Sequence, residues 1–258
     1  MTDHVLVEKS GDHVLVITLN RPEARNAVSI EMAQKIAETV QAADQDPDVR
    51  VGILTSSSDG VFCSGADLKV LAAGRTRELS FGEHGFSGFM RGDWRIPWIA
   101  AVSGVTLGGG MEFALACDMV VATETTTFGV PEVKRGGFAA AGGVFRLPRV
   151  IPRSIAIEMA VTGEPISAQR AYELGLVNHL TAPGKALGKA LEIAAQIARA
   201  APMAVRESLA LARVAQEHTE DELWALSKEA GKRIGRSRDF IEGAKAFAEK
   251  RPPVWTGN

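Results

Sequence analysis

Two glutamates of this chain each stand beside a turn with unusual backbone requirements. Glu112 follows the three glycines at 108–110 inside an otherwise apolar run, and Glu132 follows Pro131 directly. Paired carboxylates allow one group to act as a base while the other acts as an acid. A carboxylate in the first turn of a helix is either a solvated partner of the helix dipole or a buried acid with a chemical role. The pair raises the hypothesis of proton transfer.

The glycines before Glu112 indicate a second chemical feature. The stretch 99–118 reads as a buried strand, a glycine turn and a helix start, whose first N–H groups have no partner within the helix. Gly65-Ala66-Asp67 reads as another loop that leads into a helix. If one N–H from each turn, at Ala66 and Gly109, met at one oxygen, they would form an oxyanion hole, in which one donor is worth ~3 kcal/mol. The plainer alternative is a turn that only permits close packing; neither a Rossmann fingerprint nor a P-loop is present.

These features together match one kind of reaction. Adding water across a double bond that is conjugated to a carbonyl needs a base for the water, an acid for the α-carbon and donors for the enolate oxygen. Two carboxylates and two N–H donors are such a set.

Composition sets the limits for any ligand. The chain has 258 residues, 46% hydrophobic and 23% charged, with a net charge of −2. This is typical of a globular protein that buries a large core, and it provides no general attraction for nucleic acid. Cys63 and Cys117 match no metal spacing and are expected to be free, buried thiols. No metal site is expected. No signal peptide or membrane-spanning run is recognisable, which predicts a cytoplasmic protein.

The elements that must position these residues follow a repeated order. Residues 5–8 and 13–19 predict a hairpin, Ser29 caps a helix from about 30 to 43, and 51–55 and 119–122 predict strands. A helix is expected from Arg149 to Gly163. Strand, glycine turn and helix recur, which favours an α/β fold with parallel crossovers.

Two stretches are less regular. Residues 73–93, with five glycines and His84, predict a long irregular connection that is functional or mobile. Segment 136–143 is expected to lie close to a ligand. From Lys185 onward helix follows helix, so residues 201–258 are predicted to form either an oligomerisation region or a covering layer.

Four ordered motifs resemble those of the enoyl-CoA hydratase/isomerase (crotonase) superfamily. They are Asn20-Arg21-Pro22 with Asn26-Ala27, then Phe62 to Leu68, Gly104 to Asp118, and Phe128 to Glu132. The resemblance covers nearly the whole chain. It implies a spiral of repeated ββα units over residues 1–200 and a C-terminal helical region, 201–258, that builds homotrimers, often paired into hexamers.

The resemblance also implies a coenzyme A thioester as substrate and no separate cofactor. The thioester carbonyl would be held by the N–H groups of Ala66 and Gly109, while Glu112 and Glu132 hold water and Glu132 protonates the α-carbon. The residues implied in substrate binding are Ala24, Arg25, Ser64, Asp67, Leu68, Lys69 and Ala140, with Phe247 and Lys250 reaching a neighbouring subunit's ligand. For each cation a solvated surface charge is the alternative, and Asp67 reads first as a carboxylate that orients the helix start.

Retention of both glutamates favours an enoyl-CoA hydratase. Phe138-Ala139-Ala140-Ala141-Gly142-Gly143 departs from the Pro-Gly-Ala-Gly-Gly of many fatty-acid hydratases and is similar to carnitinyl-CoA dehydratase-like members. The alternatives are therefore another acyl-CoA reaction, isomerisation or dehydration, and a non-catalytic acyl-CoA-binding protein. Lys134 and Arg135 are expected to point to solvent, because desolvating two cations would be costly.

Overall fold

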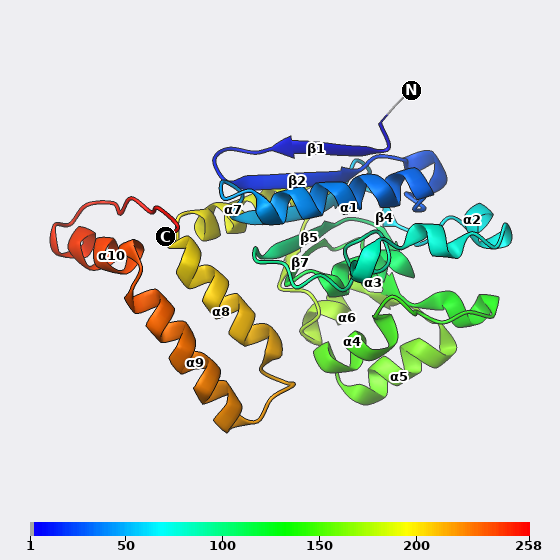
Figure 1. Ribbon diagram of the computed structural model, residues 1–258. Helices are drawn as coiled ribbons and strands as arrows, with labels where there is room; N and C mark the ends of the chain where they lie inside the picture. The colour runs from blue at the N-terminus through cyan, green and yellow to red at the C-terminus, as the bar shows by residue number, and fades with distance from the viewer. Residues whose placement is uncertain (1–2) are drawn as a thin grey trace.

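The computed structural model describes residues 3–258 and contains two β-sheets (Figure 1). The larger has six strands in the order β1-β2-β3-β5-β7-β10, in which only β1 and β2 run antiparallel. Its strands are β1 (Val5–Lys9), β2 (Val14–Leu19), β3 (Val51–Ser56), β5 (Trp98–Val102), β7 (Met119–Thr123) and β10 (His179–Thr181). The smaller sheet contains β4 (Val61–Cys63), β6 (Val105–Leu107), β8 (Thr127–Gly129) and β9 (Ile166–Ser167).

The chain alternates between these sheets and so forms the spiral of ββα units that the resemblance implied. β3 is followed by β4, β5 by β6 and β7 by β8, each time crossing from the larger to the smaller sheet. Helix α3 (Gly109–Ala116) closes the middle unit, and α2 (Leu68–Ala72) follows β4. Because β4, β6 and β8 run parallel, their carboxyl ends lie at one edge, where the turns at 64–67 and 108–110 and Glu132 follow.

The remaining helices cover the sheets or extend from them. They are α1 (Ile30–Gln45), α4 (Gly143–Val150), α5 (Arg153–Thr162), α6 (Ala168–Glu173), α7 (Ala186–Ala198), α8 (Pro202–Val214), α9 (Glu220–Gly235) and α10 (Arg238–Ala248). Short 3-10 helices span Pro22–Ala24, Thr76–Leu79, Gly82–His84 and Pro131–Arg135.

Both faces of the larger sheet are buried along its inner strands β2, β3, β5 and β7, which is what continuous apolar strands require. Alternate residues of β2 point to opposite sides, Val16 toward α7 and Ile17 toward the main core. Helix α7 packs through alanines at every fourth position, Ala186, Ala190, Ala194 and Ala198. These small side chains let the helix lie close to the strands.

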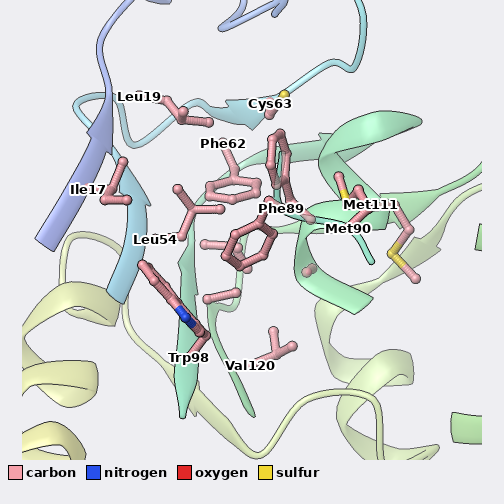
Figure 2. Close-up of a cluster of buried hydrophobic side chains, with 14 of the residues drawn as sticks. Ile17, Leu19, Leu54, Phe62, Cys63, Phe89, Met90, Trp98, Met111 and Val120 are labelled. Atoms are coloured by element: carbon pink, nitrogen blue, oxygen red, sulfur yellow. The ribbon is translucent and has the colours of Figure 1, made fainter. Parts of the chain in front are cut away.

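The main core lies between the larger sheet and the elements that carry the candidate site. Phe62 of β4, Met111 of α3 and Phe89 are fully buried beside Trp98 and Leu54 of the sheet (Figure 2). The rings of Phe89 and Trp98 meet edge to face, with 5.2 Å between their centroids. The start of α3 therefore packs against close-packed core side chains that fix its position.

Two sequence predictions need correction. The single helix expected from Arg149 to Gly163 is two helices, α4 and α5, separated at Ile151-Pro152, because Pro152 disfavours helical backbone at Ile151. Segment 73–93 is less irregular than expected: it has two 3-10 turns and buries Leu79, Phe89 and Met90.

Other predictions hold with small changes. Cys63 is buried and Cys117 is half-buried, both as free thiols. The hairpin at β1 and β2, the Ser29 cap and the helical C-terminal stretch are confirmed.

The C-terminal helices extend away from the two sheets (Figure 1). Helix α8 is fastened to the core by Arg213, whose Nε and Nη2 donate to the carboxylate of Asp118 at 2.7 and 2.8 Å. The boundary at residue 200 between a catalytic core and an oligomerisation region remains a prediction. Within residues 3–258, no helix combines the length and apolarity needed to cross a bilayer.

The packing of α7 leads to a test. Ala194→Leu is expected to destabilise the protein by about 1–3 kcal/mol, because the added methyl groups have no room against the sheet. Ala195→Leu, one residue along on the exposed side, is the matched control and should change stability by less than about 0.5 kcal/mol. Chemical denaturation measures both. Equal effects would show that α7 does not pack as described.

Candidate active site

Two chain segments meet backbone to backbone at the carboxyl edge of the smaller sheet. A Cβ added to Gly65 would lie 2.9 Å from the backbone nitrogen of Gly109 and 3.7 Å from the carbonyl carbon of Gly108. Gly65 also has a φ of +99°, which residues with side chains rarely adopt. Glycine at this position therefore brings the turn after β4 against the start of α3.

Each of these segments presents one backbone N–H without a protein acceptor. The turn after β4 is held by Val28, which donates to the carbonyl of Gly65 at 2.8 Å and accepts from the N–H of Asp67 at 3.0 Å. Neither of these two hydrogen bonds uses the N–H of Ala66. Gly109 is the first residue of α3, so its N–H has no intrahelical partner. Within the part of the chain that the structure describes, neither N–H donates a hydrogen bond.

Glu112 is a buried acid rather than a solvated partner of the helix dipole. Its side chain is on the first turn of α3, the residue is 4% exposed, and Oε1 accepts from the N–H of Gly143 at 3.0 Å. Burial raises the pKa of Glu112 to about 7, while the N–H groups of Gly143 and Ala141 act in the opposite direction. The negative charge of Glu132 also raises this pKa, which indicates that the two carboxylates lie near each other.

Glu132 approaches the same helix start. Its Oε1 lies 3.2 Å from the position that a Cβ of Gly108 would take, so Gly108 leaves room for the carboxyl group. Burial raises the pKa of Glu132, and among residues 3–258 its buried Oε2 has no hydrogen-bond partner. Lys134 points outward to Glu164, with 2.6 Å between Nζ and Oε1, and Arg135 is exposed, as predicted.

The residues expected to hold the rest of a ligand gather beside this edge. The N–H of Ser64 donates to the carbonyl of Arg25 at 3.1 Å, which brings the 21–27 loop against the turn after β4. Ala24 ends the 3-10 helix before Arg25. Leu68 and Lys69 follow on the first turn of α2, and both are exposed. Arg25, in the 21–27 loop, is exposed as well. Two cations and an apolar side chain thus lie at the rim.

Asp67 has its oxygens engaged within the protein. Its Oδ2 accepts from Arg21 Nη1 at 2.7 Å, and its Oδ1 caps α2 by accepting from the N–H of Lys69 at 2.9 Å. The hydrogen bond from Arg21 holds the pKa of Asp67 below its usual range. These contacts give Asp67 the role of orienting the turn.

The three other predicted residues lie in two different places. Ala140 is exposed in the segment before α4, as is Phe138, and it directly precedes Ala141, whose N–H stabilises the Glu112 carboxylate. Phe247 and Lys250 are at the end of α10, far from α3 within this chain (Figure 1), and Phe247 is 88% exposed. Their predicted contact with a neighbouring subunit's ligand remains a prediction.

Two further residues at this site, Phe86 and Arg146, were not predicted from the sequence. The ring of Phe86, in segment 73–93, lies 3.3 Å from the position that a Cβ of Gly109 would take and packs against Phe113. Arg146 of α4 reaches the turn that donates to Glu112. An aromatic residue in a glycine-rich segment, or an arginine in an amphipathic helix, forms no sequence pattern that marks it as a site residue. His84 packs on Trp94, with 4.8 Å between ring centroids.

Comparison with known proteins places this arrangement in a family. The family model described as enoyl-CoA hydratase/isomerase matches residues 9–258. The chain belongs to the enoyl-CoA hydratase/isomerase family. A carnitinyl-CoA dehydratase of Proteus mirabilis is 37% identical over 249 residues, which are 95% of each chain.

Solved structures of this family share the fold. An enoyl-CoA hydratase of Mycobacterium marinum is 43% identical, with a TM-score of 0.93 over 99% of each chain. A carnitinyl-CoA hydratase of Mycobacterium avium is 38% identical, with a TM-score of 0.77 over all of both chains. The chain is thus a crotonase-type enzyme of the hydratase or dehydratase kind.

The burial of Glu112 predicts a stability that depends on pH. Because its pKa is raised in the folded state, the penalty for burying the charge is absent below the unfolded value near 4.5 and grows as pH rises toward about 7. Glu112→Gln is therefore expected to raise the free energy of unfolding by roughly 2–3 kcal/mol at pH 8, and by much less at pH 5. Denaturant titrations at the two pH values measure this difference. A variant that is destabilised equally at both would contradict it.

Proposed function

We propose that this enzyme adds water reversibly to a 2-enoyl-CoA to give a 3-hydroxyacyl-CoA. The observation that supports this most directly is the pairing of two unused N–H groups, at Ala66 and Gly109, with the buried Glu112 and the half-buried Glu132, whose pKa values are both raised. The N–H groups fit the thioester oxygen and the carboxyls fit the two proton transfers. The family membership adds the coenzyme A thioester as the substrate class.

The two glutamates differ in surroundings, and this suggests their roles. Burial raises the pKa of both carboxyls, but the N–H of Gly143 and the charge of Arg146 oppose the rise at Glu112, which supports its role as the base. Glu132 Oε2 is buried without a partner among the described residues, which supports its role as the acid. In hydration Glu112 takes a proton from water as the oxygen bonds to C3. The electron pair of the double bond moves toward the thioester oxygen, and Glu132 then protonates C2. The reverse sequence is dehydration.

The reaction so proposed needs no metal ion or organic cofactor, because coenzyme A belongs to the substrate and all protons pass between the carboxyls and water. We place the phosphates of coenzyme A near Arg25 and Lys69, and the pantetheine chain along Ala24, Ser64 and Leu68. Ala140 would contribute a backbone N–H close to the water. The site is open to solvent at the two cations.

We also propose that the enzyme is a homotrimer, or a hexamer of paired trimers. The support is the apolar surface of the C-terminal helices, where Trp224 and Ile241 are each 67% exposed and Phe247 is 88% exposed. In such an assembly Phe247 and Lys250 would reach the ligand of a neighbouring subunit.

Dehydration of a functionalised acyl group is the second candidate. The carnitinyl-CoA dehydratases among the relatives and the run Phe138-Ala139-Ala140-Ala141 both favour it. It uses the same glutamates in the opposite direction, so only the acyl group distinguishes the two.

Turnover assays test both candidates. Loss of conjugated-thioester absorbance with crotonyl-CoA reports hydration, and gain of absorbance with carnitinyl-CoA reports dehydration. Glu112→Gln and Glu132→Gln are each expected to lower kcat by roughly 10²–10⁴-fold while acyl-CoA binding is kept. Glu31→Gln, an exposed carboxylate on α1, is the control and should turn over normally. Binding without turnover of either substrate, or of longer acyl groups, would instead support a non-catalytic acyl-CoA-binding protein.

A further inference from the structure

The guanidinium group of Arg146 joins three segments around Glu112. Arg146 belongs to α4, its Nη1 donates to the carbonyl of Ala141 at 3.5 Å, and its Nη2 donates to the carbonyl of Met90. Nη1 also lies 2.6 Å from the position that a Cβ of Gly142 would take. The side chain is half-buried and lies against the 141–143 turn rather than in solvent.

The turn that Arg146 contacts is the one that donates to Glu112. The N–H of Gly143 donates to Glu112 Oε1 at 3.0 Å, and the N–H of Ala141 also stabilises that carboxylate. A displacement of this turn would remove both donors together. Because a carboxylate that loses N–H donors is harder to ionise, the placement of the turn determines how well Glu112 serves as a base.

The positive charge of Arg146 favours the ionised form of Glu112, as do the N–H groups of the 141–143 turn. The ionisable groups that act on Glu112 are Glu132, from the 3-10 helix Pro131–Arg135, and Arg146, from α4. Arg146 is the attractive one, and the other ionisable groups that act on Arg146 besides Glu112 are Arg149 and Cys117. Replacing Arg146 with a neutral side chain leaves Glu112 with the repulsion of Glu132 alone.

We propose that Arg146 is a positioning residue for Glu112, which clamps the 141–143 turn so that its N–H groups stay aimed at that carboxylate. The inference rests on the proposed function for its kinetic readout only. The contacts of Arg146 with the turn, and of the turn with Glu112, do not depend on the acyl group.

The contact with Met90 also connects the 141–143 turn, through Arg146, with segment 73–93. Met90 is 1% exposed and follows Phe89, whose ring packs on Phe113 of α3 with 5.8 Å between centroids. The same segment carries Phe86, which lies on Gly109. An acyl group that shifted segment 73–93 would therefore act on the Glu112 turn through Arg146, so that substrate fit and base strength change together.

The kinetic test compares Arg146→Gln with wild type on whichever substrate wild type turns over. The acid limb of the pH profile of kcat/KM is expected to move up by roughly half a pH unit. We expect kcat at pH 7 to fall roughly 10- to 100-fold, because the base is misplaced. Arg149→Gln, one turn along the same helix, loses an equal charge from an exposed pair with Glu217 and should leave the profile unchanged.

An infrared pH titration of the Glu112 carboxylate tests the clamp without turnover. The Glu112 band is isolated by subtracting the spectrum of the same protein that also carries Glu112→Gln. The band is expected to titrate at higher pH in Arg146→Gln and to be unchanged in Arg149→Gln. An unchanged band in Arg146→Gln would overturn the inference. If Glu112→Gln kept full activity, the proposed function would fail while the infrared result still decided the role of Arg146.

A second variant covers a failure to fold. Arg146→Lys keeps the charge but has only one nitrogen for the carbonyls of Ala141 and Met90. Its circular dichroism spectrum should match wild type, its carboxylate band should shift less than that of Arg146→Gln, and kcat should still fall. Wild-type kcat in Arg146→Lys would show that the two-armed contact positions nothing.

Discussion

The close approach of the Gly65 turn to the first residue of α3 is the constraint on which the rest of this structure depends. With 2.9 Å between the Gly65 Cβ position and the Gly109 nitrogen, no side chain can separate the two segments. The spiral path of the chain makes the contact possible, because β4 and β6 are parallel neighbours whose carboxyl ends lead into the two segments. The segments that carry the unused N–H groups of Ala66 and Gly109, distant in the sequence, are thereby brought into contact.

A second consequence concerns charge. The same edge that exposes two N–H groups carries the buried carboxyl of Glu112 and the half-buried carboxyl of Glu132, and burial is the main cause that raises both pKa values. The negative charge of Glu132 opposes ionisation of Glu112. This repulsion disfavours the state in which both carboxyls are ionised, and acid and base chemistry on a single substrate needs one protonated and one ionised carboxyl.

Much of this was predictable from the sequence, for reasons that differ between elements. The glycine turns, the caps at Ser29 and Asp67 and the positions of Glu112 and Glu132 are local features, and local patterns indicate them well. The helix predicted over 149–163 was wrong because Pro152 disfavours helical backbone at Ile151, where α4 ends. Phe86 and Arg146 could not be predicted, since their roles come from contacts with Gly109, Ala141 and Met90 that only the tertiary fold creates. The roles given to the site residues remain predictions.

The most direct test of the central claim is a crystal structure of the enzyme with an acyl-CoA thioester bound. The account predicts that the thioester oxygen lies about 2.7–3.1 Å from the backbone nitrogens of both Ala66 and Gly109. It also predicts that C2 and C3 of the acyl group lie between the carboxyls of Glu112 and Glu132. A thioester oxygen held elsewhere, or an acyl group that reaches neither glutamate, would contradict it.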